Sequence, residues 1–355
     1  MSVPDSINTT IFSRKDKVLL IYTGGTIGMG KNPETGVLEP LDLKHLVNCM
    51  PELSIIKTKI ETYQFTPPID SSDMSPRLWS QLIRIITEKY DDYDGFVILH
   101  GTDTMAYTAS ALSFMLENLT KPVILTGSQL PINQLRTDGK ENLITSLEIA
   151  SASHKDGTAI VPEVCIYFNG KLLRGNRTTK TSADGFNAFE SFNFPHLAEA
   201  GVNIVYNEEY ILKPDFSKPM IPHTAVDPNV IVFSLFPGLQ ENIIRHILDS
   251  SELRSIVMRS FGSGNAPKHP WLTNLLQKAS ERGITIVNIS QCLAGCVEMN
   301  RYDTGYRLKS TGVISGYDST VECAITKLMC MQARFSDNKL VRHSMNRSIC
   351  GEITI

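Results

Sequence analysis

Two short segments of the sequence place threonines and an aspartate where a parallel sheet normally presents its reactive groups. Residues 18–28 read VLLIYTGGTIG and residues 95–105 read GFVILHGTDTM, so each segment is an apolar run that ends in glycine and hydroxyl side chains. In open α/β sheets, ligands bind just beyond the carboxyl ends of the strands. We therefore expect Thr26, Thr102 and Asp103 to lie where chemistry takes place.

The loops around these threonines are acidic, and they do not fit a nucleotide. The glycine loop at residues 24–30 has neither the G-x-G-x-x-G spacing of dinucleotide sites nor a P-loop lysine. Acidic residues follow the next two expected strands, in the segment 70–73 (DSSD) and at Asp103, and they would repel a polyphosphate. The same carboxylates suit the ammonium group of a small ligand, whose carboxylate could be held by the hydroxyls of Ser71 and Ser72 and by backbone N–H groups. The pattern predicts a pocket for an α-amino acid.

The two threonines suggest a nucleophile and a partner. A neutral threonine hydroxyl attacks poorly, so it needs a proton acceptor or a positioning group. Thr26 lies in a glycine loop whose backbone amides could stabilise an oxyanion, and Asp103 follows Thr102 at an expected helix start, where the helix dipole stabilises a carboxylate. Spacing alone leaves a purely structural role for Thr26 open. We interpret His100 as a supporting or capping residue, and a cation that would orient the hydroxyl is still missing.

Strand-like and helix-like segments alternate along the chain, which predicts mostly parallel sheets with helices on both faces. Apolar, β-rich runs predict strands at residues 18–22, 56–65, 96–99, 122–126, 164–168, 231–236, 255–258 and 284–289. Apolar spacing and capping residues predict helices at residues 41–50, 104–118, 138–150, 241–248, 271–281 and 320–332, and another that starts at Ser75-Pro76. The pair Asn169-Gly170 predicts a hairpin turn.

The length of the chain predicts two domains, because 355 residues are too many for one ordinary core. The alternation fails at residues 207–228, where four prolines are interspersed with charged residues, as in an interdomain linker. We expect an N-terminal arm at 1–17, an α/β catalytic domain at 18–206, the linker at 207–228 and a second α/β domain at 229–355, with both domains doubly wound.

Composition argues against several kinds of partner. The formal net charge of −3 gives no reason to expect nucleic acid or an anionic membrane surface, and no apolar run is long enough to span a bilayer. The polar segment 1–17 lacks the apolar core of a signal peptide. The seven cysteines are odd in number and scattered, so we expect reduced thiols in a cytoplasmic protein. Cys292 and Cys296 are the only close pair, and without a flanking histidine they predict no metal site.

Several motifs carry a resemblance to a known family. They lie at residues 23–28 (TGGTIG), 70–74 (DSSDM), 100–105 (HGTDTM), 126–129 (TGSQ), 174–180 (RGNRTTK) and 260–267 (SFGSGNAP). Together they resemble the bacterial-type L-asparaginases, and their variants are most similar to the cytoplasmic, type I branch. The first and third motifs are highly specific as a pair, and the resemblance covers roughly residues 17–335.

The resemblance implies hydrolysis of L-asparagine to L-aspartate and ammonia, without a cofactor, through an acyl-enzyme. It implies that Thr26 is acylated and that Thr102, Asp103 and Lys180 form a second catalytic set. The implied substrate-binding residues are Gly25, Asp70, Ser71, Ser72, Gly101, Thr102, Asp103 and, from a neighbouring subunit, Asn265. The family is usually a homotetramer of two close dimers, so L-asparagine and further copies of this chain are the expected partners.

Two points of the resemblance bear on mechanism. Lys180 would supply the missing cation. Burial favours its neutral form and a nearby Asp103 carboxylate favours its charged form; we expect the charged form, which polarises Thr102. The loop at residues 29–40 contains no tyrosine, whereas bacterial relatives usually carry one there to support the nucleophile. We expect this loop to act as a lid.

Some type I relatives bind a second asparagine at a regulatory site. Thr179, Arg259 and Cys292 lie in segments that match this region. Arg259 could clamp a carboxylate through two parallel hydrogen bonds, and an ion pair at the surface or an interface would explain it equally well. Allosteric activation by asparagine is therefore an expectation from the resemblance.

Other activities stay open. Weak hydrolysis of glutamine is expected, because one methylene is discriminated by only ~1–3 kcal/mol. The amidase part of a transfer-RNA-dependent amidotransferase carries an additional N-terminal domain, which the short segment before Val18 cannot supply. The joint presence of Thr26, Thr102, Asp103 and Lys180 disfavours a non-catalytic amino-acid sensor. The glycine loop at residues 24–30 lacks the G-x-G-x-x-G spacing of dinucleotide sites, which disfavours a nucleotide-dependent oxidoreductase.

Overall fold

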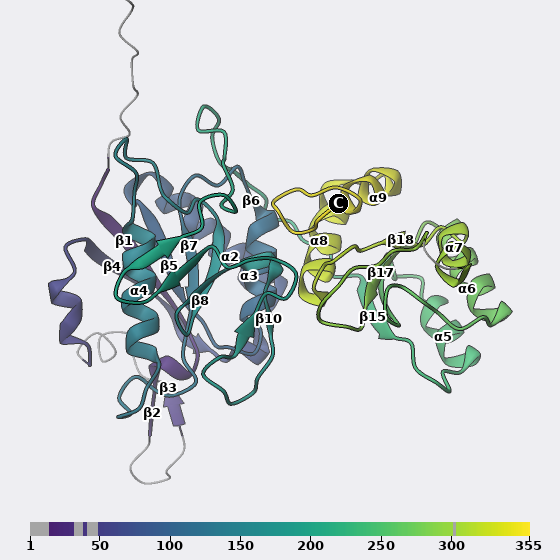
Figure 1. Cartoon of the computed structure of the whole chain (residues 1–355), viewed down its shortest axis with the longest axis horizontal. Helices are drawn as coiled ribbons and strands as arrows, with labels where there is room; N and C mark the ends of the chain where they lie inside the picture. The colour runs from purple at the N-terminus through teal and green to yellow at the C-terminus, as the bar shows by residue number, and fades with distance from the viewer. Residues whose placement is uncertain (1–13, 32–37, 41–48, 301–302) are drawn as a thin grey trace, which may run out of the picture.

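The computed structural model describes residues 14–31, 38–40, 49–300 and 303–355. Two α/β domains lie side by side in Figure 1, the first coloured purple to teal and the second green to yellow. Each has a central sheet with largely parallel strands and apolar clusters on both faces, so the predicted doubly wound architecture is confirmed. Most of the predicted helix at 41–50 and most of the predicted arm at 1–17 lie outside the described residues, and residues 49–50 are not helical.

The N-terminal domain is built on an eight-stranded sheet in the order β13-β12-β9-β8-β7-β5-β1-β4. Its strands are β1 (Lys17–Gly24), β4 (Lys59–Ile69), β5 (Gly95–Leu99), β7 (Val123–Thr126), β8 (Val164–Phe168), β9 (Lys171–Arg174), β12 (Ala198–Ala200) and β13 (Ile204–Tyr206). Neighbours from β4 to β8 run parallel, whereas β9, β12 and β13 pair antiparallel. The predicted hairpin turn lies between β8 and β9, where Asn169 (φ 49°) and Gly170 (φ 80°) both adopt the positive φ of a type I′ turn.

The strand predicted at residues 56–65 is displaced along the chain. Residues Pro51–Ile55 form a short 3-10 helix, η2, and β4 begins only at Lys59. It then continues through Pro67 and Pro68 to Ile69. Prolines fit there because β4 is an edge strand, with a ladder partner on one side only in the described sheet. The prediction ended the strand before the prolines, whereas β4 continues up to the acidic loop that was expected to follow it.

Helices cover both faces of the large sheet. Helices α2 (Pro76–Lys89) and α3 (Met105–Met115) pack on one face, in a buried cluster that includes Leu19. Helix α4 (Gly139–Ser151) packs on the other face, in a cluster that includes Leu20. Both faces of β1 are therefore covered by apolar side chains. Polar residues that must reach a ligand can follow β1 only in the loop at its carboxyl end.

The helix predicted at residues 104–118 is shorter than expected. Helix α3 ends at Met115 because the next residues form β6 (Leu116–Glu117), which pairs with β14 (Ile221–Pro222). Strand β14 lies within the segment predicted as a linker. Part of this segment therefore packs on the N-terminal domain through β14.

The C-terminal domain is built on a parallel sheet in the order β15-β16-β17-β18. Its strands are β15 (Val230–Ser234), β16 (Ser255–Ser260), β17 (Thr285–Ser290) and β18 (Ile314–Ser315). Helices α5 (Glu241–Leu248) and α6 (Pro270–Glu281) pack on one face. Helices α8 (Val321–Arg334) and α9 (Asn338–Met345) pack on the other. Helix α9, strand β18 and helix α7 (Asp303–Ser310) were not predicted from the sequence.

The remaining elements are short and lie in loops. They are β2 (Met29–Lys31), β3 (Leu38–Pro40), β10 (Thr179–Lys180), β11 (Phe189–Glu190) and the 3-10 turns η1 (Thr26–Gly28), η3 (Ser71–Asp73), η4 (Tyr90–Asp92) and η5 (Gly175–Arg177). Three of these turns, η1, η3 and η5, belong to the motifs that carry the resemblance. The motifs thus fold as tight turns at the ends of strands.

Helix α8 joins the two domains into one core. It packs against α3 of the N-terminal domain, as Figure 1 shows near the middle of the molecule. The buried cluster that contains Leu112 of α3 also contains Leu328 of α8 and Val287 of β17, and all three side chains are 0% exposed. The domains therefore share apolar packing and are not independent cores.

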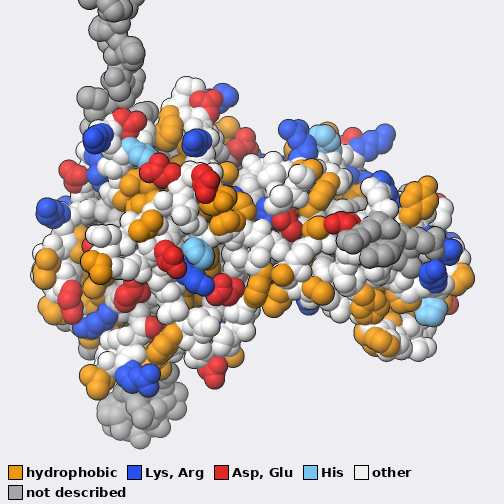
Figure 2. All heavy atoms as spheres, in the orientation of Figure 1, with side chains coloured by type: hydrophobic (Ala, Val, Ile, Leu, Met, Phe, Trp, Pro, Cys, Tyr) orange, Lys and Arg blue, Asp and Glu red, His pale blue; other side chains and the backbone are white. Residues whose placement is uncertain are grey.

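The surface has no strong bias in charge on the face drawn in Figure 2, where acidic and basic side chains are mixed over both domains. None of the helices in the described ranges is both long and apolar enough to traverse a lipid bilayer. The seven cysteines form no disulfide, and Cys292 and Cys296 are exposed.

The shared core predicts a large effect of one substitution on stability. Replacing Leu328 with alanine should lower the free energy of unfolding by about 2–5 kcal/mol, because it removes a fully buried side chain and leaves a cavity between the domains. Urea unfolding followed by circular dichroism measures the change. Leu340→Ala on α9 is the control, because Leu340 is 46% exposed. A loss below about 1 kcal/mol for Leu328→Ala would contradict the shared core.

Candidate active site

Three loops meet at the carboxyl ends of the parallel strands β4, β1 and β5. A Cβ atom added to Gly25 would lie 2.6 Å from Cα of Gly101, and one added to Gly101 would lie 2.4 Å from Oγ of Ser71. Side chains do not fit at such distances, so this approach requires glycine at both positions. The hydroxyl of Thr104 donates to the carbonyl of Ser71 at 2.7 Å, which ties the loop after β5 to the loop after β4. The structure therefore brings three of the predicted motifs together.

Thr26 is presented on the turn that follows β1. It is the first residue of η1 and is half-buried, and Gly25 before it has a φ of 93°, which L-residues rarely adopt. Beneath the turn, the hydroxyl of Tyr22 donates to the carbonyl of Gly28 at 3.3 Å. Burial raises the pKa of Tyr22 to about 12. The phenol therefore stays protonated at neutral pH and supports the turn.

Lys180 brings a cation to the second threonine. Its Nζ atom lies 2.7 Å from Oγ1 of Thr102 and 2.7 Å from Oδ1 of Asp103. Thr102 is 8% exposed, whereas the Asp103 side chain is 66% exposed. The ammonium group thus bridges a buried hydroxyl and a carboxylate that faces solvent, and the structure brings these three predicted residues together.

The loop after β4 is held by its own aspartate. Oδ1 of Asp70 accepts hydrogen bonds from the backbone N–H and the hydroxyl of Ser72, both at 2.9 Å. These two bonds lower the pKa of Asp70. Ser71 is buried beside Gly101, while Ser72 is exposed. Asp70 therefore orients the loop, and the two serines differ in their access to a ligand.

His100 lies beneath the loop and not in the cluster of polar side chains. Its Nδ1 atom is 2.7 Å from the carbonyl of Gly101, which can only accept, so Nδ1 carries the proton. Its Nε2 atom then accepts from the hydroxyl of Thr108 at 2.9 Å, and Oγ1 of Thr108 accepts from the indole N–H of Trp79 at 3.1 Å. Burial lowers the pKa of His100 to about 4. The neutral ring is therefore a support for the loop, consistent with our interpretation.

The remaining predicted residues belong to the junction of the domains or to the C-terminal domain. Thr179 donates to Oε1 of Glu322 at 2.7 Å. Burial raises the pKa of Glu322, and the bond from Thr179 and the nearby Arg259 guanidinium partly offset this rise. Cys292 is exposed in the loop after β17, and Asn265 is half-buried in the loop after β16. The structure thus gathers Thr179 and Arg259 around Glu322, whereas Asn265 belongs to the other domain from the catalytic cluster.

Two contacting residues had no predicted role. The hydroxyl of Thr102 lies 3.4 Å from Oε1 of Gln129, whose amide N–H donates to the carbonyl of Gly185 at 2.9 Å. Gln129 ends the motif at 126–129, so its position after β7 was an available signal. Glu322 comes from α8, and nothing in the local sequence indicates that this helix reaches Thr179.

The described residues offer no cluster of three or more His, Cys, Asp or Glu side chains that could hold a metal ion. The base of the predicted lid is the antiparallel pair β2 and β3. The tip of the lid, at residues 32–37, lies outside the described residues.

Comparison with known proteins agrees with this geometry. Residues 17–212 match the family model described as Asparaginase, N-terminal, and residues 229–345 match the model described as Glutaminase/Asparaginase C-terminal domain. The chain belongs to the asparaginase family. The two matches cover the two domains of the structure, and the catalytic cluster lies within the first.

Relatives within the asparaginase family match over most of this chain. "L-asparaginase 1" of Escherichia coli (strain K12) is 43% identical over 96% of this chain and 99% of its own length. The crystal structure of L-asparaginase I from Vibrio cholerae is 41% identical, has a TM-score of 0.87, and the match covers 97% of this chain and 100% of that one. The "60 kDa lysophospholipase" of Mus musculus is 41% identical over 88% of this chain, and the match spans 58% of its length.

The buried histidine predicts a pH dependence of stability. The folded state favours the neutral ring, so between pH 6.5 and about 4 the unfolded chain binds more protons at this residue. The free energy of unfolding should therefore fall as the pH falls through this range, and His100 should account for about 3 kcal/mol of the decrease. Urea unfolding at several pH values measures the slope, and His100→Gln should make it shallower. An equal slope in the variant, or a ring that titrates near 6.5 by NMR, would contradict the assignment.

Proposed function

We propose that this protein is an L-asparagine amidohydrolase, which hydrolyses L-asparagine to L-aspartate and ammonia through an ester on Thr26 and without a cofactor. The observation that carries the proposal is the position of Lys180, whose Nζ atom is 2.7 Å from both Thr102 and Asp103 beside the Gly25 turn. At this edge of the sheet the loops carry the hydroxyl of Thr26, the hydroxyl of Thr102, which Lys180 polarises, and the solvent-facing carboxylate of Asp103. Membership of the asparaginase family supports the choice of substrate.

The substrate is proposed to bind through its α-amino and α-carboxylate groups. The exposed carboxylate of Asp103 suits the ammonium group. The backbone around Ser71 suits the carboxylate, since the Asp70 contacts fix that loop, and the hydroxyl of Ser72 can donate to the carboxylate after it turns away from Asp70. Gly25 and Gly101 keep the backbone close to the ligand because they carry no side chain. These contacts would direct the side-chain amide toward Thr26.

The proposed reaction has two steps. Oγ1 of Thr26 bonds to the amide carbon, the carbon–nitrogen bond breaks, and the leaving nitrogen takes the Thr26 proton to form ammonia. Water then attacks the ester, aspartate leaves, and Thr26 regains its proton. Lys180 keeps its charge in this scheme because it donates to the Asp103 carboxylate, and it polarises Thr102. Backbone N–H groups of the glycine turn stabilise the oxyanion in both steps.

A weak activity on glutamine is part of the proposal. Glutamine differs from asparagine by one methylene group, and a pocket typically separates such substrates by only ~1–3 kcal/mol. The same amino and carboxylate contacts would hold both amino acids. Asparagine is expected to be the better substrate.

We also propose that a second asparagine binds near Thr179, Arg259 and Cys292. Support comes from two buried polar atoms, Nε of Arg259 and Oε2 of Glu322, that have no hydrogen-bond partner in the described part of the chain. Residues of β16 and β17 pair up to Ser260 and Ser290, so Cys292 follows a strand end beside Arg259. Activation predicts a sigmoidal dependence of rate on asparagine concentration. Ammonia release measured over a wide range tests this, and a hyperbolic curve would contradict it.

The active enzyme is proposed to be a homotetramer of two close dimers. Asn265 lies in the C-terminal domain, and the family resemblance is the ground for proposing that a neighbouring subunit brings it to the catalytic cluster. A cytoplasmic location is also proposed, since cysteines that form no disulfide, two of them exposed at Cys292 and Cys296, suit a reducing compartment.

The proposed function is tested by ammonia release from asparagine and glutamine with two variants. Thr26→Ala should lower kcat by at least ~10³-fold, about 4 kcal/mol of barrier, because it removes the atom that is acylated. Thr62→Ala, an exposed threonine of β4, is the control and should keep full activity. Thermal unfolding should be similar for both variants. No ammonia from either substrate would indicate a sensor, and full activity of Thr26→Ala would exclude the proposed nucleophile.

A further inference from the structure

The segment that carries Lys180 receives little support from the large sheet. After β9 the chain passes through η5 and reaches β10, which among the described residues pairs only with β11, in a separate two-stranded sheet. Lys180 is nevertheless held within 2.7 Å of two other side chains. Other contacts must therefore fix the segment between Arg174 and Lys180.

One side of this segment rests on α3. A Cβ atom added to Gly175 would lie 2.9 Å from Cβ of Ala109, so η5 presses directly on the helix. The hydroxyl of Ser110 donates to the carbonyl of Gly175 at 3.4 Å. Helix α3 follows Thr102 and Asp103, and η5 precedes Lys180. The contact between α3 and η5 therefore helps to set the distance from Lys180 to Thr102 and Asp103.

The other side is held by the C-terminal tail, residues 347–355. Arg177 donates from Nε to the carbonyl of Gly351 at 2.7 Å and from Nη2 to Oγ1 of Thr354 at 3.1 Å. Its Nη1 atom lies 2.8 Å from Oδ2 of Asp318, in an ion pair with side chains 2% and 8% exposed. Oδ1 of Asp318 in turn accepts from the backbone N–H of Thr354 at 2.9 Å. Arg177, Asp318 and the tail thus form a closed, mostly buried set of contacts.

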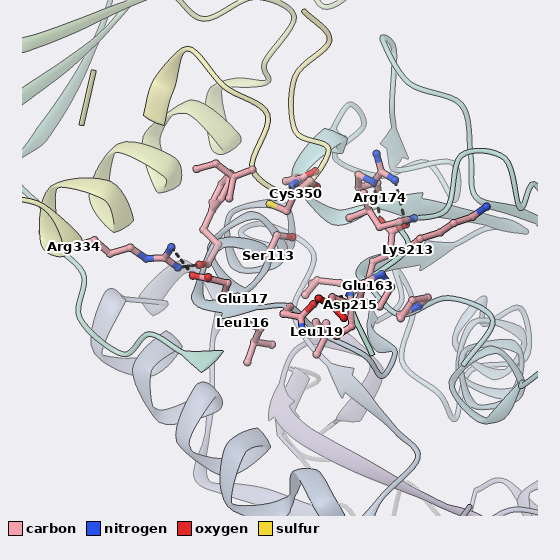
Figure 3. A pocket seen from close by; sticks show the side chains of 18 residues that line it. Ser113, Leu116, Glu117, Leu119, Glu163, Arg174, Lys213, Asp215, Arg334 and Cys350 are labelled. Atoms are coloured by element: carbon pink, nitrogen blue, oxygen red, sulfur yellow. Dashed lines mark hydrogen bonds and ion pairs between the residues drawn. The ribbon is translucent and has the colours of Figure 1, made fainter. Parts of the chain in front are cut away.

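Neighbouring contacts continue the same attachment. Arg174 donates to the carbonyl of Gly351 at 3.3 Å, and Asn176 donates to the carbonyl of Cys350 at 3.1 Å. Figure 3 shows Cys350 of the tail beside Arg174, above a cavity of about 350 Å³ between the domains. The tail therefore contacts η5 through several residues, and Ile349 and Cys350 of the tail line the cavity.

The tail is in turn anchored to the C-terminal domain. Nζ of Lys327 on α8 lies 2.5 Å from Oε1 of Glu352, and these side chains are 2% and 0% exposed. Oε2 of Glu352 also accepts from the backbone N–H groups of Ile349 and Cys350. A buried ion pair with these additional bonds resists displacement, because breaking it would leave an uncompensated charge inside the protein. The C-terminal domain therefore holds η5 through the tail.

We propose that Arg177 is a positioning residue which, through Asp318 and the tail residues Gly351 and Thr354, fixes Lys180 against Thr102. Arg177 lies three residues before Lys180, with Thr178 and Thr179 between them, so a shift of η5 is transmitted directly to the lysine. Displacing a reacting group by about 1 Å can cost roughly 10²-fold in rate. The inference rests on the proposed function, in which Lys180 acts on Thr102.

The inference predicts a selective loss of kcat. Arg177→Gln should lower kcat for asparagine by about 10- to 100-fold and change KM less, because the residue does not touch the substrate. Arg177→Lys should recover part of the loss, since it keeps the charge that faces Asp318. Thr354→Val, at an exposed tail position, should give a smaller loss without a folding defect. Ser255→Ala is the control, because it removes a buried hydrogen bond between β16 and Gln332 of α8, away from η5.

The decisive comparison uses Lys180→Met. In that background Arg177→Gln should have no further effect on kcat beyond about twofold, because Arg177 acts through the missing lysine. The inference is overturned if Arg177→Gln lowers kcat equally with and without Lys180, or if Arg177→Gln and Ser255→Ala have equal effects on kcat. If Lys180→Met alone keeps full kcat, the proposed role of Lys180 fails instead, and the two failures are thereby distinguished.

Discussion

The proposed catalytic cluster depends on one ammonium group that must be held against a hydroxyl and a carboxylate at the same time. Lys180 makes both contacts at 2.7 Å, although it comes from a short strand outside the main sheet. Thr102 and Asp103 follow a strand that is buried on every residue, so they are fixed by the core of the N-terminal domain. The lysine has to be brought to them by separate contacts. Much of the architecture around η5 serves this purpose.

Backbone atoms also crowd together at the carboxyl ends of β1 and β5. Gly25 and Gly101 approach so closely that no side chain fits between them. This approach places the turn of Thr26 and the loop of Thr102 at one edge of the sheet. His100, neutral and buried, and Tyr22, protonated and buried, support the two loops from below. The polar cluster is thus supported by hydrogen bonds of two side chains, His100 and Tyr22, whose protonation states do not change near neutral pH.

Much of this arrangement could be predicted from the sequence, because its signals are local. Apolar runs followed by glycine and threonine indicated the strands β1 and β5 and the loops after them, and the structure has both. The prediction was wrong for the start and end of β4, since prolines 67 and 68 are tolerated only because the strand lies at the sheet edge. It also missed Glu322 and the whole tail attachment. The bond from Thr179 to Glu322 and the bonds between η5 and the tail join residues more than 100 positions apart, and no short pattern in the sequence marks them.

The central claim is that Thr26 carries the substrate's acyl group during turnover. The most direct measurement is peptide mass spectrometry of enzyme quenched in acid while it hydrolyses L-asparagine. The account predicts an aspartyl ester on the peptide that contains Thr26. An ester on Thr102 or on any other residue would contradict it.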